Sequence, residues 1–169
     1  NAILRDRSQA YARVNGRAQV EAIEREDLVL FKLGNDVYGI PCDEIEEVIP
    51  LQNLVALPNA SRAILGISSL RGILFAVVDL KRVLNIPASE LSTMHRVLMI
   101  RHENFKVGFL VDSVQGMRGF DRHDLQEIPP EVHERSRSYL HGLLSGNVLI
   151  LNARTVLQDP LVVGEGRTS

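Results

Sequence analysis

An internal repeat constrains the fold of this 169-residue chain more than any other feature of its sequence. Three windows of the first half align without gaps on three windows of the second half, in the same order. The aligned pairs are 38–45 with 107–114, 64–69 with 140–145, and 79–84 with 152–157. Each repeated unit has about 60 to 70 residues, a size at which a lone core is marginal. We therefore expect two similar units that pack against each other, with a groove between them where a partner can bind.

The repeated positions carry the residues that shape turns and helix ends. The first pair of windows keeps a glycine and an aspartate in register, and the second pair sets Gly66 over Gly142. In the third pair, Asp79 and Asn152 each follow an apolar run directly. A side-chain oxygen at that position accepts from the free N–H groups of a short helix, so a helical turn should close each unit.

Short β-rich runs fill the chain from residue 28 onward, and Gly, Asn, Asp and Pro separate them. The runs are 28–33, 37–40, 66–70, 73–78, 96–101, 106–111 and 147–151. The first two flank Gly34-Asn35-Asp36 and predict a hairpin. Helical patterns of the length that would alternate with strands in a parallel sheet do not occur between these runs. The pattern predicts a mainly β fold of antiparallel barrels or sandwiches with short accessory helices.

The first 26 residues carry a different pattern, in which apolar residues recur at spacings of three, four and seven with arginines between them. Asn15 and Gly16 weaken the middle of this segment, so we expect a helix from residue 2 to about residue 14. We interpret residues 1–26 as an N-terminal helical extension that packs on its own domain, and leave open a role in partner binding. The stripe that would form this accessory interface contains Ile3, Leu4, Tyr11 and Val14.

The composition excludes several classes of function. Nineteen Lys and Arg residues against twenty-one Asp and Glu residues give a net charge of −2. Such a chain has no global positive field that would hold a nucleic acid or an acidic membrane surface. No apolar run approaches the roughly 18 residues that would insert across a bilayer. The single cysteine, Cys42, cannot form an internal disulfide, and no signal peptide is visible, so we expect a cytoplasmic location.

Patterns of catalytic and metal-ligating residues are missing from the sequence. The five histidines form no H-E-x-x-H motif and no pair at helical i, i+4 spacing. The serines form no G-x-S-x-G motif, and no glycine pattern typical of a phosphate site occurs. His123-Asp124 lies in the polar stretch 118–126, which we interpret as a solvated loop. We expect neither catalysis nor a metal nor a cofactor.

Two charged residues are candidates for a binding site. Glu47 lies two positions after Ile45, and strand alternation would place both on one face. Arg71 lies between two apolar runs, beside Gly72, which can adopt the positive φ of a tight turn. From the residues alone, Arg71 is either a solvent-facing turn residue or an arginine folded over a groove to donate to a partner.

The chain resembles the CheW family in a set of short motifs whose order and spacing agree from about residue 27 to residue 157. The motifs are Phe31-Lys32-Leu33-Gly34, Tyr38-Gly39-Ile40-Pro41, Ile45-Glu46-Glu47-Val48-Ile49, Leu57-Pro58, Ile64-Leu65-Gly66-Ile67, Leu70-Arg71-Gly72, Val77-Val78-Asp79-Leu80, Gly108 to Asp112 and Tyr139-Leu140-His141-Gly142. The resemblance implies two interlocked five-stranded SH3-like barrels. It assigns residues 27–160 to a CheW-like domain with subdomains of about 27–90 and 91–160 that exchange strands or helices at their ends, followed by a flexible tail, 161–169.

The same resemblance implies a function and a site. CheW-like proteins are adaptors that couple methyl-accepting chemoreceptor tips to the regulatory domain of a CheA-type histidine kinase, at receptor arrays in the membrane. Carried over by motif position, the residues that engage receptor or kinase are Ile45, Glu47, Gly66 and Arg71. Other interpretations stay open: a CheW-like domain of a larger kinase, a CheV-type or type IV pilus signalling protein, or, more remotely, a small-ligand-binding barrel or an enzyme.

Overall fold

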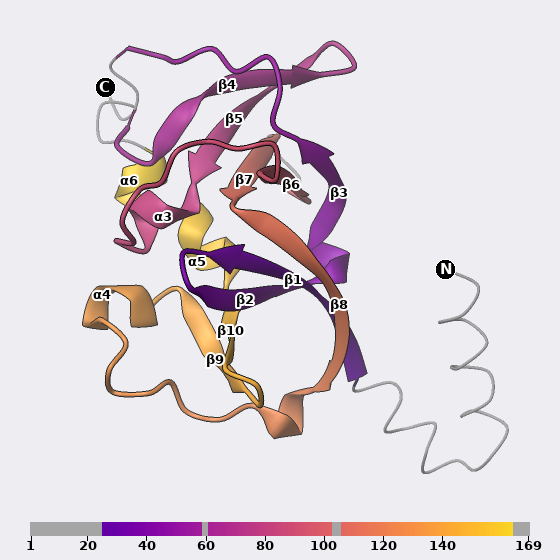
Figure 1. Cartoon of the computed structure of the whole chain (residues 1–169), viewed down its shortest axis with the longest axis vertical. Helices are drawn as coiled ribbons and strands as arrows, with labels where there is room; N and C mark the ends of the chain where they lie inside the picture. The colour runs from indigo at the N-terminus through magenta and orange to yellow at the C-terminus, as the bar shows by residue number, and fades with distance from the viewer. Residues whose placement is uncertain (1–24, 59–60, 103–105, 164–169) are drawn as a thin grey trace, which may run out of the picture.

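The computed structural model describes residues 25–58, 61–102 and 106–163 (Figure 1). The strands are β1 (Arg25–Leu33), β2 (Asp36–Pro41), β3 (Ile45–Pro50), β4 (Ile64–Leu70), β5 (Ile73–Asp79), β6 (Arg96–Ile100), β7 (Val107–Val111), β8 (Ser113–Asp121), β9 (Leu140–Leu144) and β10 (Val148–Leu151). The short helices are η1 (Cys42–Glu44), α3 (Leu80–Val83), η2 (Arg122–Asp124), α4 (Glu134–Arg137), α5 (Ala153–Leu157) and α6 (Pro160–Val163). Among these helices, none has the length and apolar character of a membrane span.

The strands form two sheets of the same design. The first sheet has the order β8-β1-β2-β10-β9 and the second has the order β3-β6-β7-β5-β4. In each sheet an antiparallel hairpin lies in the middle, and the second strand of that hairpin pairs in parallel with the second strand of another hairpin. Each sheet takes strands from both 27–90 and 91–160, so the two units exchange strands. The mainly β prediction is confirmed.

Each sheet closes on itself through one further backbone bridge. Val55, which follows β3, exchanges two hydrogen bonds of 2.8 Å with Ile67 of β4. Gln126, which follows β8, bridges Leu143 of β9 in the same way, at 2.8 and 3.0 Å. These bridges link the two edges of each sheet, which removes the unpaired edge that an open sheet would present and makes each sheet a five-stranded barrel.

The strand register confirms the repeat. Gly39 of the first window pairs with Ile150, and Gly108 of the second window pairs with Val77, each in the parallel direction. Gly142 faces Ile150 and Gly66 faces Val77 across their antiparallel ladders, so the second pair of windows is also equivalent. The repeated windows therefore occupy matching places in the two barrels.

The helix caps expected at the third pair of windows are present. The Asp79 carboxylate accepts from the backbone N–H of Lys81, at the start of α3. The Asn152 side-chain oxygen accepts from the N–H of Thr155, at the start of α5. Both caps satisfy donors that a short helix leaves free at its N-terminus.

The largest hydrophobic core lies between the barrels, because it draws buried residues from both sheets. Within it the rings of Phe31 and Tyr38 stack with centroids 6.0 Å apart. A smaller cluster fills each barrel on its own, around Phe75 in the second sheet and around Phe120 in the first. Most of the buried apolar surface is thus shared, as expected for two units that are marginal alone.

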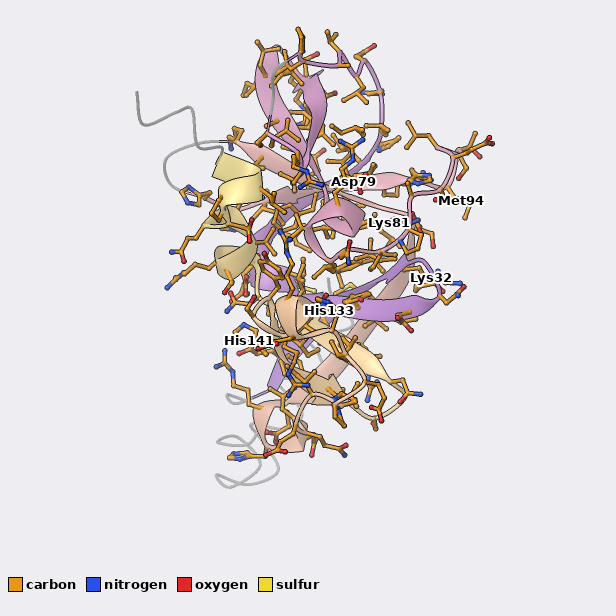
Figure 2. The ribbon with its side chains drawn as sticks, turned by 90° about the vertical axis from the view of Figure 1, so that its left-hand side faces the viewer. Lys32, Asp79, Lys81, Met94, His133 and His141 are labelled. Carbon is orange, nitrogen blue, oxygen red and sulfur yellow. The ribbon has the colours of Figure 1, made fainter. Side chains whose placement is uncertain are left out.

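A partly buried polar cluster, in which Lys81 and His95 are the buried members, connects the two barrels beside this core. The Asp112 carboxylate lies 2.7 Å from Lys81 Nζ and 3.2 Å from His95 Nε2, and it accepts from the Gly34 N–H at 2.8 Å. Lys81 Nζ also donates to Ser89 Oγ, at 2.7 Å. Lys81 lies at the level where the sheets meet, above the β1–β2 hairpin that carries Lys32 (Figure 2). The cluster therefore ties α3, the β1–β2 turn and the β7–β8 junction together.

Two segments differ from the expectations. Residues 118–121 belong to β8 instead of a loop, because the nine-residue β1 extends far enough to pair with them, from Arg25 opposite Asp121 to Leu28 opposite Arg118. Residues 161–163 of the expected tail lie in α6, where Leu161 and Val162 pack against the shared core. The predicted N-terminal helix with its stripe lies outside the described residues.

Removing the Asp112 carboxylate should destabilise the whole domain, because Lys81 would then stay buried without its counter-charge. We expect Asp112→Ala to lower the free energy of unfolding by about 3 to 5 kcal/mol in urea denaturation. The matched control is Asp43→Ala, at the equivalent but exposed position of the first window. That change should cost no more than ~0.5 kcal/mol. Equal losses for the two variants would contradict a stabilising role of the cluster.

Candidate functional site

A shallow depression lies on the second barrel, where the β4–β5 hairpin meets β3, β6 and the start of β7. Its lining combines an apolar floor with a charged rim and consists of Glu46, Glu47, Leu70, Arg71, Ile73, Phe75, Met99 and Lys106. The depression encloses about 90 Å³. Pockets that enclose small ligands usually have about 300 to 1,000 Å³, so this one has room for a single side chain of a partner instead.

The turn of the β4–β5 hairpin presents Arg71 to this depression. Arg71 has a φ of 51° and Gly72 a φ of 81°, the left-handed pair that joins two strands in a tight two-residue turn. The Arg71 guanidinium donates to both carboxylate oxygens of Glu47, at 2.8 and 3.1 Å. Arg71 shows a feature of each interpretation: its side chain is 68% exposed, and it folds back over the depression to an acceptor in the same chain, whereas donation to a partner stays a prediction.

A β-bulge changes the faces on which the β3 side chains lie. Ile45 pairs with Ile100, and Glu47 pairs with the next residue, Met99, so Glu46 is the extra residue of the bulge. Because Ile100 and Met99 lie on opposite faces of β6, Ile45 and Glu47 do as well. The expectation that Ile45 and Glu47 share one face is therefore wrong. Ile45 is 8% exposed and belongs to the core between the barrels.

Gly66 does not line the depression either. A Cβ at this position would lie 2.4 Å from the backbone oxygen of Val55, the residue that closes the barrel against β4. At the equivalent Gly142, a Cβ would lie 2.9 Å from the backbone oxygen of Gln126. Both glycines permit the close backbone approach of the closing bridge, which is a structural role. Of the four sequence-predicted residues, the structure brings together Glu47 and Arg71.

The sequence reasoning missed a second ion pair at the same rim. Lys106, directly before β7, contacts both carboxylate oxygens of Glu46, at 3.0 and 3.2 Å. In a regular strand Glu46 and Glu47 would lie on opposite faces, but the bulge lets both line the depression. The sequence carries no local signal for this pair, because its two partners are sixty residues apart.

Exposed apolar side chains occur at the hairpin tip beside the depression and at two separate strand positions. Ile73 and Leu74 at the hairpin tip are 52% and 69% exposed. Val48 of β3 and Met117 of β8 are exposed as well. They occupy equivalent places in the two barrels, because Val48 pairs with Leu98 and Met117 pairs with Val29, the equivalent of Leu98. Ile73 and Leu74 are consecutive at the hairpin tip, and exposed apolar side chains that lie together are typical of protein-binding surfaces.

The chemistry of the described residues gives no indication of catalysis or metal binding. Burial, with Asp27 and Asp43 nearby, raises the pKa of the Cys42 thiol, which keeps it protonated and unreactive. Among residues 25–58, 61–102 and 106–163, no group of three or more His, Cys, Asp and Glu side chains could hold a metal ion. What the depression can do is bind a side chain of another protein.

The ion pair at the hairpin should be visible in a pH titration. The hydrogen bonds from Arg71 hold the pKa of Glu47 below its ordinary value of 4.5. A depressed carboxylate pKa contributes stability above the unfolded-state pKa and loses it as the pH falls through the folded pKa. We expect an NMR titration midpoint for Glu47 below 4.5, and a return toward 4.5 in Arg71→Ala. Arg135→Ala, on α4, should leave the midpoint in place, and an unchanged midpoint in Arg71→Ala would contradict the pairing.

Comparisons with known proteins agree with this architecture. The model of the CheW-like domain family matches residues 27–160. Protein PilI of Pseudomonas aeruginosa is 29% identical over 126 residues, which cover 75% of this chain and 71% of PilI. The chemotaxis protein CheW of Bacillus subtilis is 22% identical over 127 residues, which cover 75% of this chain and 81% of that protein.

A solved structure shows the same fold. The crystal structure of the scaffolding protein TtCheW from Thermoanaerobacter tengcongensis is similar with a TM-score of 0.67 and 26% sequence identity. The similarity covers 75% of this chain and 83% of that structure. Because the family model spans both barrels and the duplicated sheets match in fold, this chain belongs to the CheW-like domain family of non-catalytic adaptor proteins.

Proposed function

We propose that this chain couples methyl-accepting chemoreceptor tips to a CheA-type histidine kinase in the cytoplasm, at receptor arrays in the membrane. The observation that carries the proposal is the depression on the second barrel. There, Glu47 and Arg71, the two charged residues that the resemblance assigns to partner binding, form a bidentate ion pair over an apolar floor. A preformed pair of this kind orients both side chains before binding, which reduces the entropy lost on association.

An adaptor must bind two partners at once, and the chain offers two apolar surfaces for this purpose. One is the β4–β5 hairpin tip of the second barrel, with Ile73 and Leu74, and the other is the exposed face of β8 on the first barrel, with Met117. We propose that the kinase and the receptor each use one of these surfaces. A change of contacts at one surface can then shift the equilibrium at the other without chemistry in the adaptor itself.

A second candidate function follows from the similarity to PilI, at 29% identity over 126 residues. In this version the same surfaces serve a type IV pilus signalling pathway in place of a motility pathway. Deletion of the gene would separate the two candidates, because loss of pilus-dependent surface movement with intact swimming indicates the pilus pathway. The reverse phenotype indicates the motility pathway.

Arg71→Ala tests the site. We expect the affinity for the regulatory domain of the CheA-type kinase, or for a receptor-tip fragment from the same genome, to fall by about 1 to 3 kcal/mol, the range for a lost charge-assisted hydrogen bond. Isothermal titration calorimetry measures the change, and the melting temperature shows that the domain stays folded. A substitution such as Ile45→Asp is unsuitable because it would place a carboxylate in the shared core.

Arg135→Ala serves as the matched control, since it removes an arginine from α4, away from the depression. We expect this control to bind both partners as the wild type does. Normal binding of Arg71→Ala to both partners, with an unchanged melting temperature, would refute the site. Arg71 would then be a turn residue with a structural role only.

A further inference from the structure

The charges at the rim of the depression are balanced in number but differ in solvent exposure. Two glutamates and two cations cancel in number, yet the cations reach further into solvent. The side chains of Arg71 and Lys106 are 68% and 40% exposed, whereas those of Glu47 and Glu46 are 35% and 32% exposed. A partner that approaches the depression therefore meets the cationic groups first.

The two cations also keep hydrogen-bonding capacity for a partner. A guanidinium has five N–H donors, and Arg71 directs two of them at Glu47. The ammonium group of Lys106 has three donors and contacts the two oxygens of Glu46. The remaining donors lie at the rim of a depression whose floor is apolar, with Phe75 and Met99 among its lining residues.

The first barrel lacks this arrangement, although it has the same bulge. Its bulge follows Val114, the equivalent of Ile45, so that Gln115 and Gly116 occupy the places of Glu46 and Glu47. Gln115 donates to Ser113 Oγ, and Gly116 has no side chain. The place of Lys106 is taken by Val37, directly before the repeated window. The paired charges were therefore not needed to build a barrel of this type.

We propose that Lys106, with Arg71, selects a partner segment in which a carboxylate lies next to an apolar side chain. The apolar side chain occupies the depression, and Lys106 and Arg71 donate to the carboxylate. Glu46 and Glu47 hold the two cations in place and repel a partner that presents its carboxylate too deep in the depression. This inference rests on the proposed function, because it concerns the partner that binds this barrel.

Two substitutions that break the same ion pair test the inference. Lys106→Gln removes the donor that we assign to the partner, so the affinity should fall about tenfold, and the affinity should depend less on salt concentration. Glu46→Gln frees Lys106 and should leave the affinity unchanged or raise it. If the pair were only structural, both variants would lose affinity equally. The probes are the regulatory domain of the CheA-type kinase and the receptor-tip fragment from the same genome.

Binding of the wild type and of Arg71→Ala is measured first. If the wild type binds neither probe, the proposed function fails and this inference fails with it. If Arg71→Ala weakens binding but Lys106→Gln and Glu46→Gln behave alike, or Lys106→Gln binds as the wild type does, only the role of Lys106 is refuted. A loss of affinity in Lys106→Gln together with an unchanged or raised affinity in Glu46→Gln, both at unchanged melting temperature, supports it.

Discussion

The arrangement of the two barrels depends on one partly buried carboxylate, that of Asp112. Its oxygens receive hydrogen bonds or ionic contacts from the β1–β2 turn, from α3 and from the segment before β6. His95 has its other ring nitrogen, Nδ1, occupied by the N–H of Ser92, so the Nε2 proton is directed at Asp112. A buried lysine and histidine need such an acceptor, because an unpaired polar group in a low-dielectric interior is costly. The carboxylate thus specifies how the sheets meet, while the apolar core between them supplies most of the stability.

In the repeat, positions that determine the backbone are shared, whereas side chains that face solvent diverge. Backbone-determining positions are duplicated: the strand glycines, the helix caps, the closing bridges and the bulge after Ile45 and Val114. Side chains that face solvent at those same places differ, and only the second barrel carries the paired charges. Because both barrels have the same bulge, the two charged side chains could be placed at this position of the second barrel without a change of fold.

Much of the fold followed from the sequence, since the repeat, the β periodicity and the caps are local patterns. The bulge in β3 was not predicted, because a single extra residue leaves the sequence pattern of the strand intact while it reverses the face of every later side chain. The extension of β8 to Asp121 was not predicted, because its exposed residues are polar and only the length of β1 shows that they are paired. For the site, the motif positions were sufficient to predict that Glu47 and Arg71 belong together, and the structure pairs them. The Glu46–Lys106 pair depends on how β3 and β7 lie in the folded sheet, which no spacing in the sequence shows.

The two hairpins that contain the equivalent Gly66 and Gly142 differ in length, and this difference explains why the proposed binding surface lies on one barrel. Counted from the equivalent pairs Ser68–Phe75 and Leu144–Val148, the first hairpin continues through residues 69–74 and the second through 145–147 only. In Figure 1 the β4–β5 hairpin lies at the far end of the molecule from the first sheet. Its tip, with Arg71, Ile73 and Leu74, is therefore exposed beyond the last pair that the barrel core requires. Residues at such a tip can change with the partner at little cost in stability, whereas the shorter hairpin ends where its core ends and leaves no surface of this kind.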